Sequence, residues 1–232
     1  MIPRYSRPEM NAIWTEDNSF DLWLMVEIAA CEAWTEQGVV PEQDMVKIRD
    51  AKFDRLIYDK GFSKETKHDI VSLHAPLVKV LGLKGRWIHH GLTSNDVKDT
   101  ALSLQLVQSC DLLDKGLVGL LNALRKRAIE FKETPCIGRS HGIHAEPMSF
   151  GLKLALWFGE IKRHRDRLVG VRSRVAVGML SGPVGTFASV PPSIEESVCR
   201  QLGLNPAEVS NQVIQRDRHA STCNSWLSLR QP

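Results

Sequence analysis

Two long runs of apolar residues at helical spacing constrain the fold of this chain more than any other feature. Leucine and other apolar residues recur every three or four positions across residues 97–131, and again across residues 148–174. A helix of about 35 residues extends roughly 50 Å, which is far longer than a usual globular helix. The two runs predict antiparallel helices in a bundle. We expect the bundle to be oligomeric, because neither helix buries its whole apolar stripe within this chain.

The rest of the chain also has helical patterns, so the sequence predicts an all-α fold. Residues 1–17 are polar, and two prolines predict an extended arm that ends where Asp17 or Asn18 caps a helix. Further helices are expected over residues 20–37, from Pro41 onward, over 63–81 with Ser63 as the cap, over 193–202 and from 212 onward. Between them, residues 82–91 and 176–192 are expected to be irregular and rich in glycine.

Composition excludes several classes of function. The chain has 30 basic and 27 acidic residues and no polybasic tail, so nucleic-acid binding is not indicated, although a small anionic substrate is compatible. It has no apolar signal core and no run of about 18 apolar residues, so we expect it to be neither secreted nor membrane-embedded. Its five scattered cysteines fit the reducing cytoplasm better than a disulfide framework.

A polar stretch, Gly138–Pro147, separates the two long helical runs. It holds two histidines, an arginine, a hydroxyl group and a carboxylate, and a second proline precedes it at Pro135. We expect the chain to leave one helix and enter the next through a loop here, because proline disrupts a helix interior. Polar groups held between rigid helices are suited to a functional site.

The chemistry available to this stretch is limited. His141 and His144 lie three residues apart, but no matching ligands accompany them, so a zinc site is not favoured. The chain also has no nucleophile elbow, and the glycine-rich segment at 176–192 lacks the ending of a P-loop. General acid–base catalysis by His141 remains, since histidine titrates near neutral pH.

Three other polar groups are interpreted first from the residues alone. Arg4 and Tyr5 fit a disordered end with a salt-bridging arginine. The triplet from Lys67 to Asp69 fits a solvated helix face. Thr93 and Ser94 precede a helix, where they serve as caps or bind an anion.

Six motifs in the same order closely resemble the adenylosuccinate lyases of the fumarase/aspartase superfamily. They cover nearly all of residues 1–221, and they are Arg4–Met10, Lys67–Asp69, His89–Val97, Gly138–Pro147, Ser181–Ala188 and Gln212–His219. The resemblance implies an N-terminal helical domain over residues 1–92, followed by a long-helix bundle domain over residues 93–232. It also implies a homotetramer that acts on a nucleotide in the cytoplasm, with no cofactor or metal.

The resemblance implies a β-elimination that breaks a carbon–nitrogen bond. Fumarate leaves adenylosuccinate to give AMP, or leaves the succinylated aminoimidazole carboxamide ribotide of purine synthesis. Carried over by motif, the catalytic residues are His141, which protonates the departing nitrogen, and His68 beside it. The substrate-binding residues implied in the same way are Arg4, Tyr5, Lys67, His68, Asp69, His89, Thr93, Ser94 and Gln212.

The sequence departs from the family in two ways. The family more often has threonine at position 140, serine or threonine at position 95, arginine at position 67 and alanine at position 183. This sequence has Ser140, Asn95, Lys67 and Pro183 at these positions. Among these, Pro183 removes a backbone donor from a substrate-side loop. The family also carries a later loop whose serine is the carbon base, and this sequence has no such loop. The apolar helix that is expected after Ser221 is replaced here by a different tail. One added thymine before the Thr222 codon restores an apolar helical reading, so we expect a frameshifted, truncated lyase.

These departures lead us to expect little or no activity from the 232-residue chain alone. An alternative is an inactive remnant or helical assembly protein that keeps part of the substrate pocket. A third hypothesis is a sister lyase that releases fumarate from another substrate. Measurement of fumarate release separates the three.

Overall fold

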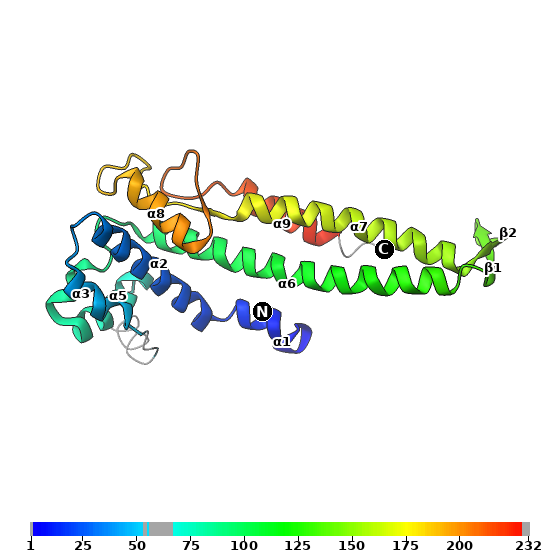
Figure 1. The fold of residues 1–232 in the computed structure, drawn as a ribbon, viewed down its shortest axis with the longest axis horizontal. Coiled ribbons are helices and arrows are strands. Elements are labelled where there is room, and N and C mark those ends of the chain that lie inside the picture. Colours follow the sequence, from blue (N-terminus) through cyan, green and yellow to red (C-terminus); the bar gives the residue numbers. More distant parts are fainter. Residues whose placement is uncertain (1, 53–54, 56–66, 229–232) are drawn as a thin grey trace. The chain divides into compact units, whose positions relative to one another are not determined.

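The computed structural model describes residues 2–52, 55 and 67–228, which are mostly helical (Figure 1). The predicted all-α class is confirmed, with two short pairs of strands in the described ranges. The chain forms two compact units, residues 1–108 with 175–216, and residues 109–174 with 217–232. The expected domain boundary at residue 92 stays a prediction about the family's architecture. None of the described helices combines the length and apolar character needed to cross a bilayer.

The first unit begins with four helical segments. These are η1 (Pro3–Tyr5), α1 (Pro8–Ile13), α2 (Glu16–Glu36) and α3 (Glu42–Arg49). The prediction of an extended arm was wrong, because Pro8 occupies the start of α1, where its missing N–H and fixed φ are tolerated. The predicted cap was also wrong: the hydroxyl of Thr15 accepts the backbone N–H of Asn18 at 3.2 Å and caps α2.

The segment before the long helix contains α5 (Asp69–Leu81) and η3 (Gly82–Trp87). His68 is the N-cap of α5, and its Nδ1 accepts the backbone N–H of Val71. The predicted cap at Ser63 lies outside the described residues. The first six residues of the segment expected to be irregular form the 3₁₀ helix η3, and α6 (Ser94–Glu130) then begins close to the predicted residue.

Helix α2 lies at the centre of the core of the first unit. Leu22 and Val26 pack with residues of α6, whereas Ala29 and Ala33 pack with α8 (Pro192–Leu202). Leu24 and Cys31 belong to a third cluster, with side chains from α3 and α5. Because α2 is covered on several sides, a polar side chain on it must find its partners inside the core.

The predicted glycine-rich loop at 176–192 contains β3 (Val177–Gly178), which pairs in parallel with β4 (Asn205–Pro206). Gly185 in this loop has φ +77°, and a Cβ placed there would lie 2.2 Å from the backbone oxygen of Ser210. A glycine is therefore required for the loop to approach the segment before Gln212.

The second unit contains the rest of α6, together with α7 (Phe150–Val175) except its last residue, and α9 (Asp217–Ser228). Helices α6 and α7 run antiparallel, as predicted, and lie side by side (Figure 1). Ion pairs between them fix their register: Asp111 pairs with Arg172, and Asp114 pairs with Arg165 at 2.7 Å.

The connection between α6 and α7 is a β-hairpin, so the prediction of a loop was wrong. Its strands are β1 (Pro135–Ser140) and β2 (Ile143–Ser149). The two turn residues, His141 and Gly142, have φ +53° and +78°, as a two-residue type I′ turn requires. Gly138 lies at a register shift, where an added Cβ would be 2.8 Å from the backbone oxygen of Glu146.

Candidate functional site

The first turns of α6 hold the motif segments of the first unit together. Asp96 is completely buried, and its Oδ2 accepts the backbone N–H of Thr93 at 2.8 Å. Its Oδ1 accepts the backbone N–H of Ser181 at 3.2 Å. Burial raises the pKa of Asp96 to about 6, against the opposing effect of N–H donors that include Gly182. Pro183 removes none of these bonds.

Two residues after Asp96, Lys98 ties α6 to the start of α5. Its Nζ lies 2.6 Å from Oδ2 of Asp69, whose Oδ1 accepts the backbone N–H of Ile70. Burial acts to raise the pKa of Asp69, but the bonds from Lys98 and Ile70 outweigh it and hold this pKa below its ordinary value. His68 next to it has a half-exposed side chain. The contact brings the Lys67–Asp69 motif to the helix start that carries Thr93 and Ser94.

Asp99 attaches a third motif to the same part of α6. Its carboxylate receives both terminal nitrogens of Arg216 at 3.0 Å and the backbone N–H of Ile214 at 2.8 Å. Gln212, two residues before Ile214, is exposed. The hydroxyls of Ser181 and Ser210 lie 2.7 Å apart and connect the glycine-rich loop to the segment that leads to Gln212. Four of the six motif segments therefore converge on the beginning of α6.

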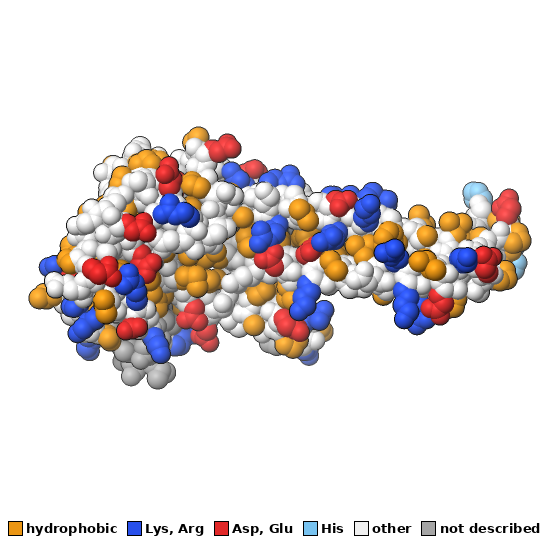
Figure 2. Space-filling view, viewed as in Figure 1, with side chains coloured by type: hydrophobic (Ala, Val, Ile, Leu, Met, Phe, Trp, Pro, Cys, Tyr) orange, Lys and Arg blue, Asp and Glu red, His pale blue; other side chains and the backbone are white. Residues whose placement is uncertain are grey.

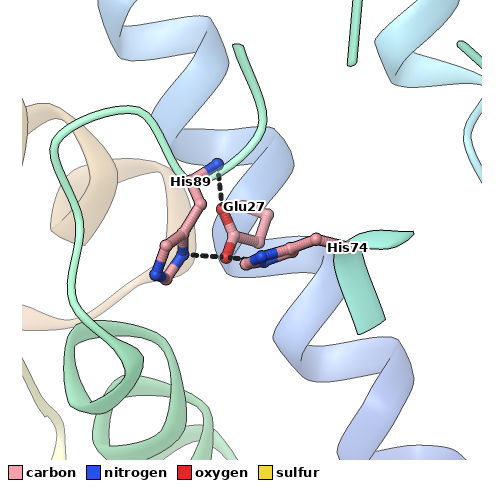
Figure 3. A group of neighbouring side chains, drawn as sticks. All are labelled: Glu27, His74 and His89. Carbon is pink, nitrogen blue, oxygen red and sulfur yellow. Dashed lines mark hydrogen bonds and ion pairs between the residues drawn. The ribbon is translucent and has the colours of Figure 1, made fainter. Parts of the chain in front are cut away.

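His89 lies on a second, deeper group of polar side chains (Figure 3). Its Nδ1 is 2.7 Å from Oε1 of Glu27, and its backbone N–H donates to Oε2 of Glu27 at 2.8 Å. Nε2 of His74 approaches the same Oε1 at 2.8 Å. Although burial acts to raise the pKa of Glu27, the bonds from the two histidines lower it to about 2.

The same three side chains are the group in the described residues with ligand atoms spaced for a metal ion, all within 4.8 Å of one another. Donor–acceptor distances of 2.7 to 2.8 Å are those of hydrogen bonds. Because three donors already satisfy the Glu27 carboxylate, the arrangement is complete without a cation.

The remaining predicted residues of the first unit lie at its surface. The guanidinium of Arg4 stacks over the ring of Tyr5 at 4.8 Å in η1. Tyr5 is 73% exposed, which leaves most of its ring available for a ligand. Lys67 is exposed and has φ +50°.

His141 belongs to the second unit, at the exposed turn of the β1–β2 hairpin. His141 and Gly142 both have a left-handed backbone conformation. The turn type therefore determines the direction in which the imidazole leaves the backbone. The other predicted site residues belong to the first unit. Assembly of His141 with them into one active site stays a prediction.

Sequence reasoning missed Glu27, His74, Lys98 and Asp99, although the sequence contained a signal for the first two. Glu27 lies on the same face of its helix as Leu24 and Cys31, three positions before and four after it. A carboxylate on an apolar stripe indicates a buried acid that needs partners. His74 likewise lies on the same face of α5 as Ile70, four positions before it, and Leu77, three positions after it.

Comparison with known proteins identifies the relatives of this chain. A family model described as Lyase matches residues 4–230. The chain belongs to this lyase family. The resemblance predicted from the six motifs is confirmed.

Two curated relatives are adenylosuccinate lyases. The protein from Bacillus subtilis (strain 168) is 49% identical over 223 residues, and the match covers 95% of this chain and 51% of the relative. The protein from Staphylococcus saprophyticus is 48% identical over 221 residues, with the same coverage of 95% and 51%. The lyase chain therefore spans about half the length of the curated relatives it matches.

Solved structures agree on the fold. A 3-carboxy-cis,cis-muconate lactonizing enzyme from Pseudomonas putida superimposes with a TM-score of 0.88 at 29% identity, covering 97% of this chain and 53% of its own. A fumarate lyase from Mesorhizobium sp. BNC1 gives a TM-score of 0.87 at 26% identity, covering 95% and 53%. The long-helix architecture is thus that of the fumarase/aspartase superfamily.

Proposed function

We propose that this lyase chain supplies the N-terminal half of an adenylosuccinate lyase. The observation that carries the proposal is the convergence of four motif segments on the first turns of α6, through Asp96, Lys98 and Asp99. The same motifs resemble the adenylosuccinate lyases, and both curated relatives bear that name. The substrates proposed are adenylosuccinate and the succinylated aminoimidazole carboxamide ribotide of purine synthesis.

The proposed chemistry needs an acid and a base on opposite sides of the bond that breaks. A base removes a carbon-bound proton, the carbon–carbon double bond of fumarate forms, and the electron pair of the carbon–nitrogen bond goes to nitrogen. His141 is proposed to protonate that nitrogen, with His68 beside it. The turn at His141 suits this role, because it places the residue at the exposed end of a short hairpin.

The first unit is proposed to bind the substrate. Its polar side chains offer donors for an anionic nucleotide, and the helix start at Thr93 and Ser94 adds the favourable end of the α6 dipole. The residues proposed to line the pocket are Arg4, Tyr5, Lys67, His68, Asp69, His89, Thr93, Ser94 and Gln212.

Assembly into a homotetramer in the cytoplasm forms part of the proposal. Several large apolar side chains of the second unit are exposed, which suits burial against other copies. They include Leu120, Ile129, Leu152, Leu156 and Trp157. Figure 2 shows apolar and basic side chains interleaved along α6 and α7. No cofactor or metal is proposed.

The test compares binding with turnover in the purified 232-residue chain. Adenylosuccinate binding is measured by calorimetry, and fumarate release is followed by ultraviolet absorbance. We expect saturable binding with little or no turnover, because the serine loop that the family uses as the carbon base has no counterpart in this sequence. Absence of binding contradicts the proposal. Binding and release with another succinylated amine alone identifies a sister lyase.

A further inference from the structure

The carboxylate of Glu27 receives three hydrogen-bond donors inside the core of the first unit. The side chain of Glu27 has no exposed surface, and its two oxygens face the rings of His74 and His89 and the backbone N–H of His89 (Figure 3). The three residues come from α2, α5 and the turn that follows η3. They are separated by 47 and 62 positions in sequence, so tertiary folding alone brings them together.

The charge of Glu27 decides where the protons of the two rings lie. The pKa of Glu27 is lowered to about 2, so the carboxylate is ionised at neutral pH and only accepts hydrogen bonds. The ring atoms that face it, Nε2 of His74 and Nδ1 of His89, must therefore carry hydrogen. A neutral His89 with hydrogen on Nδ1 has none on Nε2, which is then a hydrogen-bond acceptor.

We propose that Glu27 is a positioning residue that fixes His89 in its Nδ1–H form and leaves Nε2 as the atom that meets the substrate. The inference rests on the proposed function for the contact between His89 and substrate, but the assignment of the proton does not. Nε2 of His89 is then an acceptor for a donor of the substrate, while Nδ1 stays bonded to Glu27. His74 shares the same oxygen and keeps the carboxylate ionised.

Backbone geometry supports this assignment. His89 has φ +64°, a left-handed conformation that a residue other than glycine adopts when its surroundings fix it. Glu27 holds this residue at two points, because Oε2 accepts its backbone N–H and Oε1 accepts its ring N–H. The ring is 23% exposed, and its centroid lies 4.4 Å from that of His74, which restricts rotation. The direction and the protonation of the imidazole therefore have one common cause.

Substitution of Glu27 by glutamine gives a sharp test because the two side chains have the same shape. The backbone N–H of His89 is always a donor, so the amide oxygen of the glutamine must face it. The amide NH₂ group then faces the two rings, which must become acceptors. Glu27→Gln is thus expected to move the proton of neutral His89 from Nδ1 to Nε2, and that of His74 from Nε2 to Nδ1.

The measurement is a long-range ¹H–¹⁵N correlation spectrum of the full 232-residue chain, labelled in histidine and recorded at pH 8. His89→Gln and His74→Gln assign the signals. His90 is the matched control, because its ring packs against Trp34 and Trp87 at 5.2 and 5.8 Å outside the cluster. We expect His89 as Nδ1–H in the wild-type chain, a change to Nε2–H in Glu27→Gln and no change at His90. If Glu27 only fills space in the core and does not bond to the two rings, no such exchange of protons is expected.

Three results overturn the proposal. The first is an Nε2–H tautomer of His89 in the wild-type chain. This result contradicts the proposal even if Glu27→Gln fails to fold. The second is an unchanged tautomer in a folded Glu27→Gln chain. The third is stoichiometric Zn²⁺ binding that removes the ring protons of both histidines, which would make the group a metal site. If adenylosuccinate leaves the His89 signals unperturbed while the predicted tautomers are seen, the proposed function fails and the positioning by Glu27 stands.

Discussion

The carboxylate of Asp96 accepts the backbone N–H of Ser181, which lies 85 positions later in the sequence. The other oxygen of the same carboxylate accepts the N–H of Thr93 at the start of α6. One buried acid therefore fixes both the helix start and the glycine-rich loop. If the two motifs bind one substrate, Asp96 sets the spacing between them without touching the substrate.

Replacement of Asp96 by alanine is expected to destabilise the chain strongly. The change leaves the N–H groups of Thr93 and Ser181 without their acceptor, and each unsatisfied buried donor costs about 1–3 kcal/mol. We predict that the free energy of unfolding falls by about 2–4 kcal/mol in urea denaturation. Asp21→Ala, at an exposed position of α2, serves as the control and should change stability by less than about 0.5 kcal/mol. Equal losses in the two variants would contradict the role of Asp96.

The raised pKa of Asp96 predicts a pH dependence of stability with a defined sign. Between its ordinary value of 3.8 and about 6, the folded chain binds a proton at Asp96 that the unfolded chain has released. The contribution of Asp96 to the free energy of unfolding therefore decreases as pH rises from about 4 to about 6, by at most about 3 kcal/mol. Denaturation at several pH values gives the free energy of unfolding of wild type minus that of Asp96→Asn. This difference should fall over the range and level off above pH 7. A difference that rises over the range would show that the sign is wrong.

The bidentate pair between Asp99 and Arg216 predicts unequal effects for its two partners. Asp99→Ala leaves the buried N–H of Ile214 unpaired and should lower the free energy of unfolding by about 2–3 kcal/mol. Arg216→Ala should lower it by about 1 kcal/mol or less, because the side chain of Arg216 is 53% exposed and Asp99 keeps the N–H of Ile214 as a donor. Thermal or urea denaturation of both variants tests this order, and a larger loss for Arg216→Ala would reverse it.

Two glycines with different backbone conformations, one in the hairpin turn and one in α6, predict opposite effects of substitution by alanine. Gly142 has φ +78°, so Gly142→Ala should destabilise the hairpin by about 1–2 kcal/mol through backbone strain. Gly116 is an exposed helical residue of α6, and no atom lies within 4 Å of an added Cβ. Gly116→Ala should therefore raise the free energy of unfolding by about 1 kcal/mol. Amide hydrogen exchange of β1 and β2 measures the first effect, and denaturation measures the second. Unchanged exchange in Gly142→Ala would argue against the type I′ turn.

Helix positions could be predicted from the sequence because the apolar period of α6 and α7 is long and regular. The connection between them could not, since the polar residues of Gly138–Pro147 show no alternation of apolar and polar side chains. Its hairpin depends instead on positive φ at His141 and Gly142 and on a close backbone approach at Gly138. Such features lie in the backbone and leave little trace in composition.

The candidate site was predicted only in part for a related reason. Motif resemblance pointed to the exposed His68 and the half-buried Thr93, which contact substrate in the proposed function. The residues that hold them, including Lys98 and Asp99, read as ordinary charges on a helix, because sequence spacing does not show that Asp69 and Arg216 lie beside them. Their roles follow from tertiary contacts alone.

The most direct test of the account is complementation between two halves of the enzyme. The chain is mixed with a polypeptide that comprises the half of the Bacillus subtilis adenylosuccinate lyase that it does not match, and fumarate release from adenylosuccinate is followed by absorbance. We predict turnover by the mixture, none or almost none by either part alone, and a loss of at least about 100-fold when the chain carries His141→Gln. Undiminished turnover with His141→Gln would contradict the assignment of His141 as the acid. A folded, associated mixture without turnover would contradict the account as a whole.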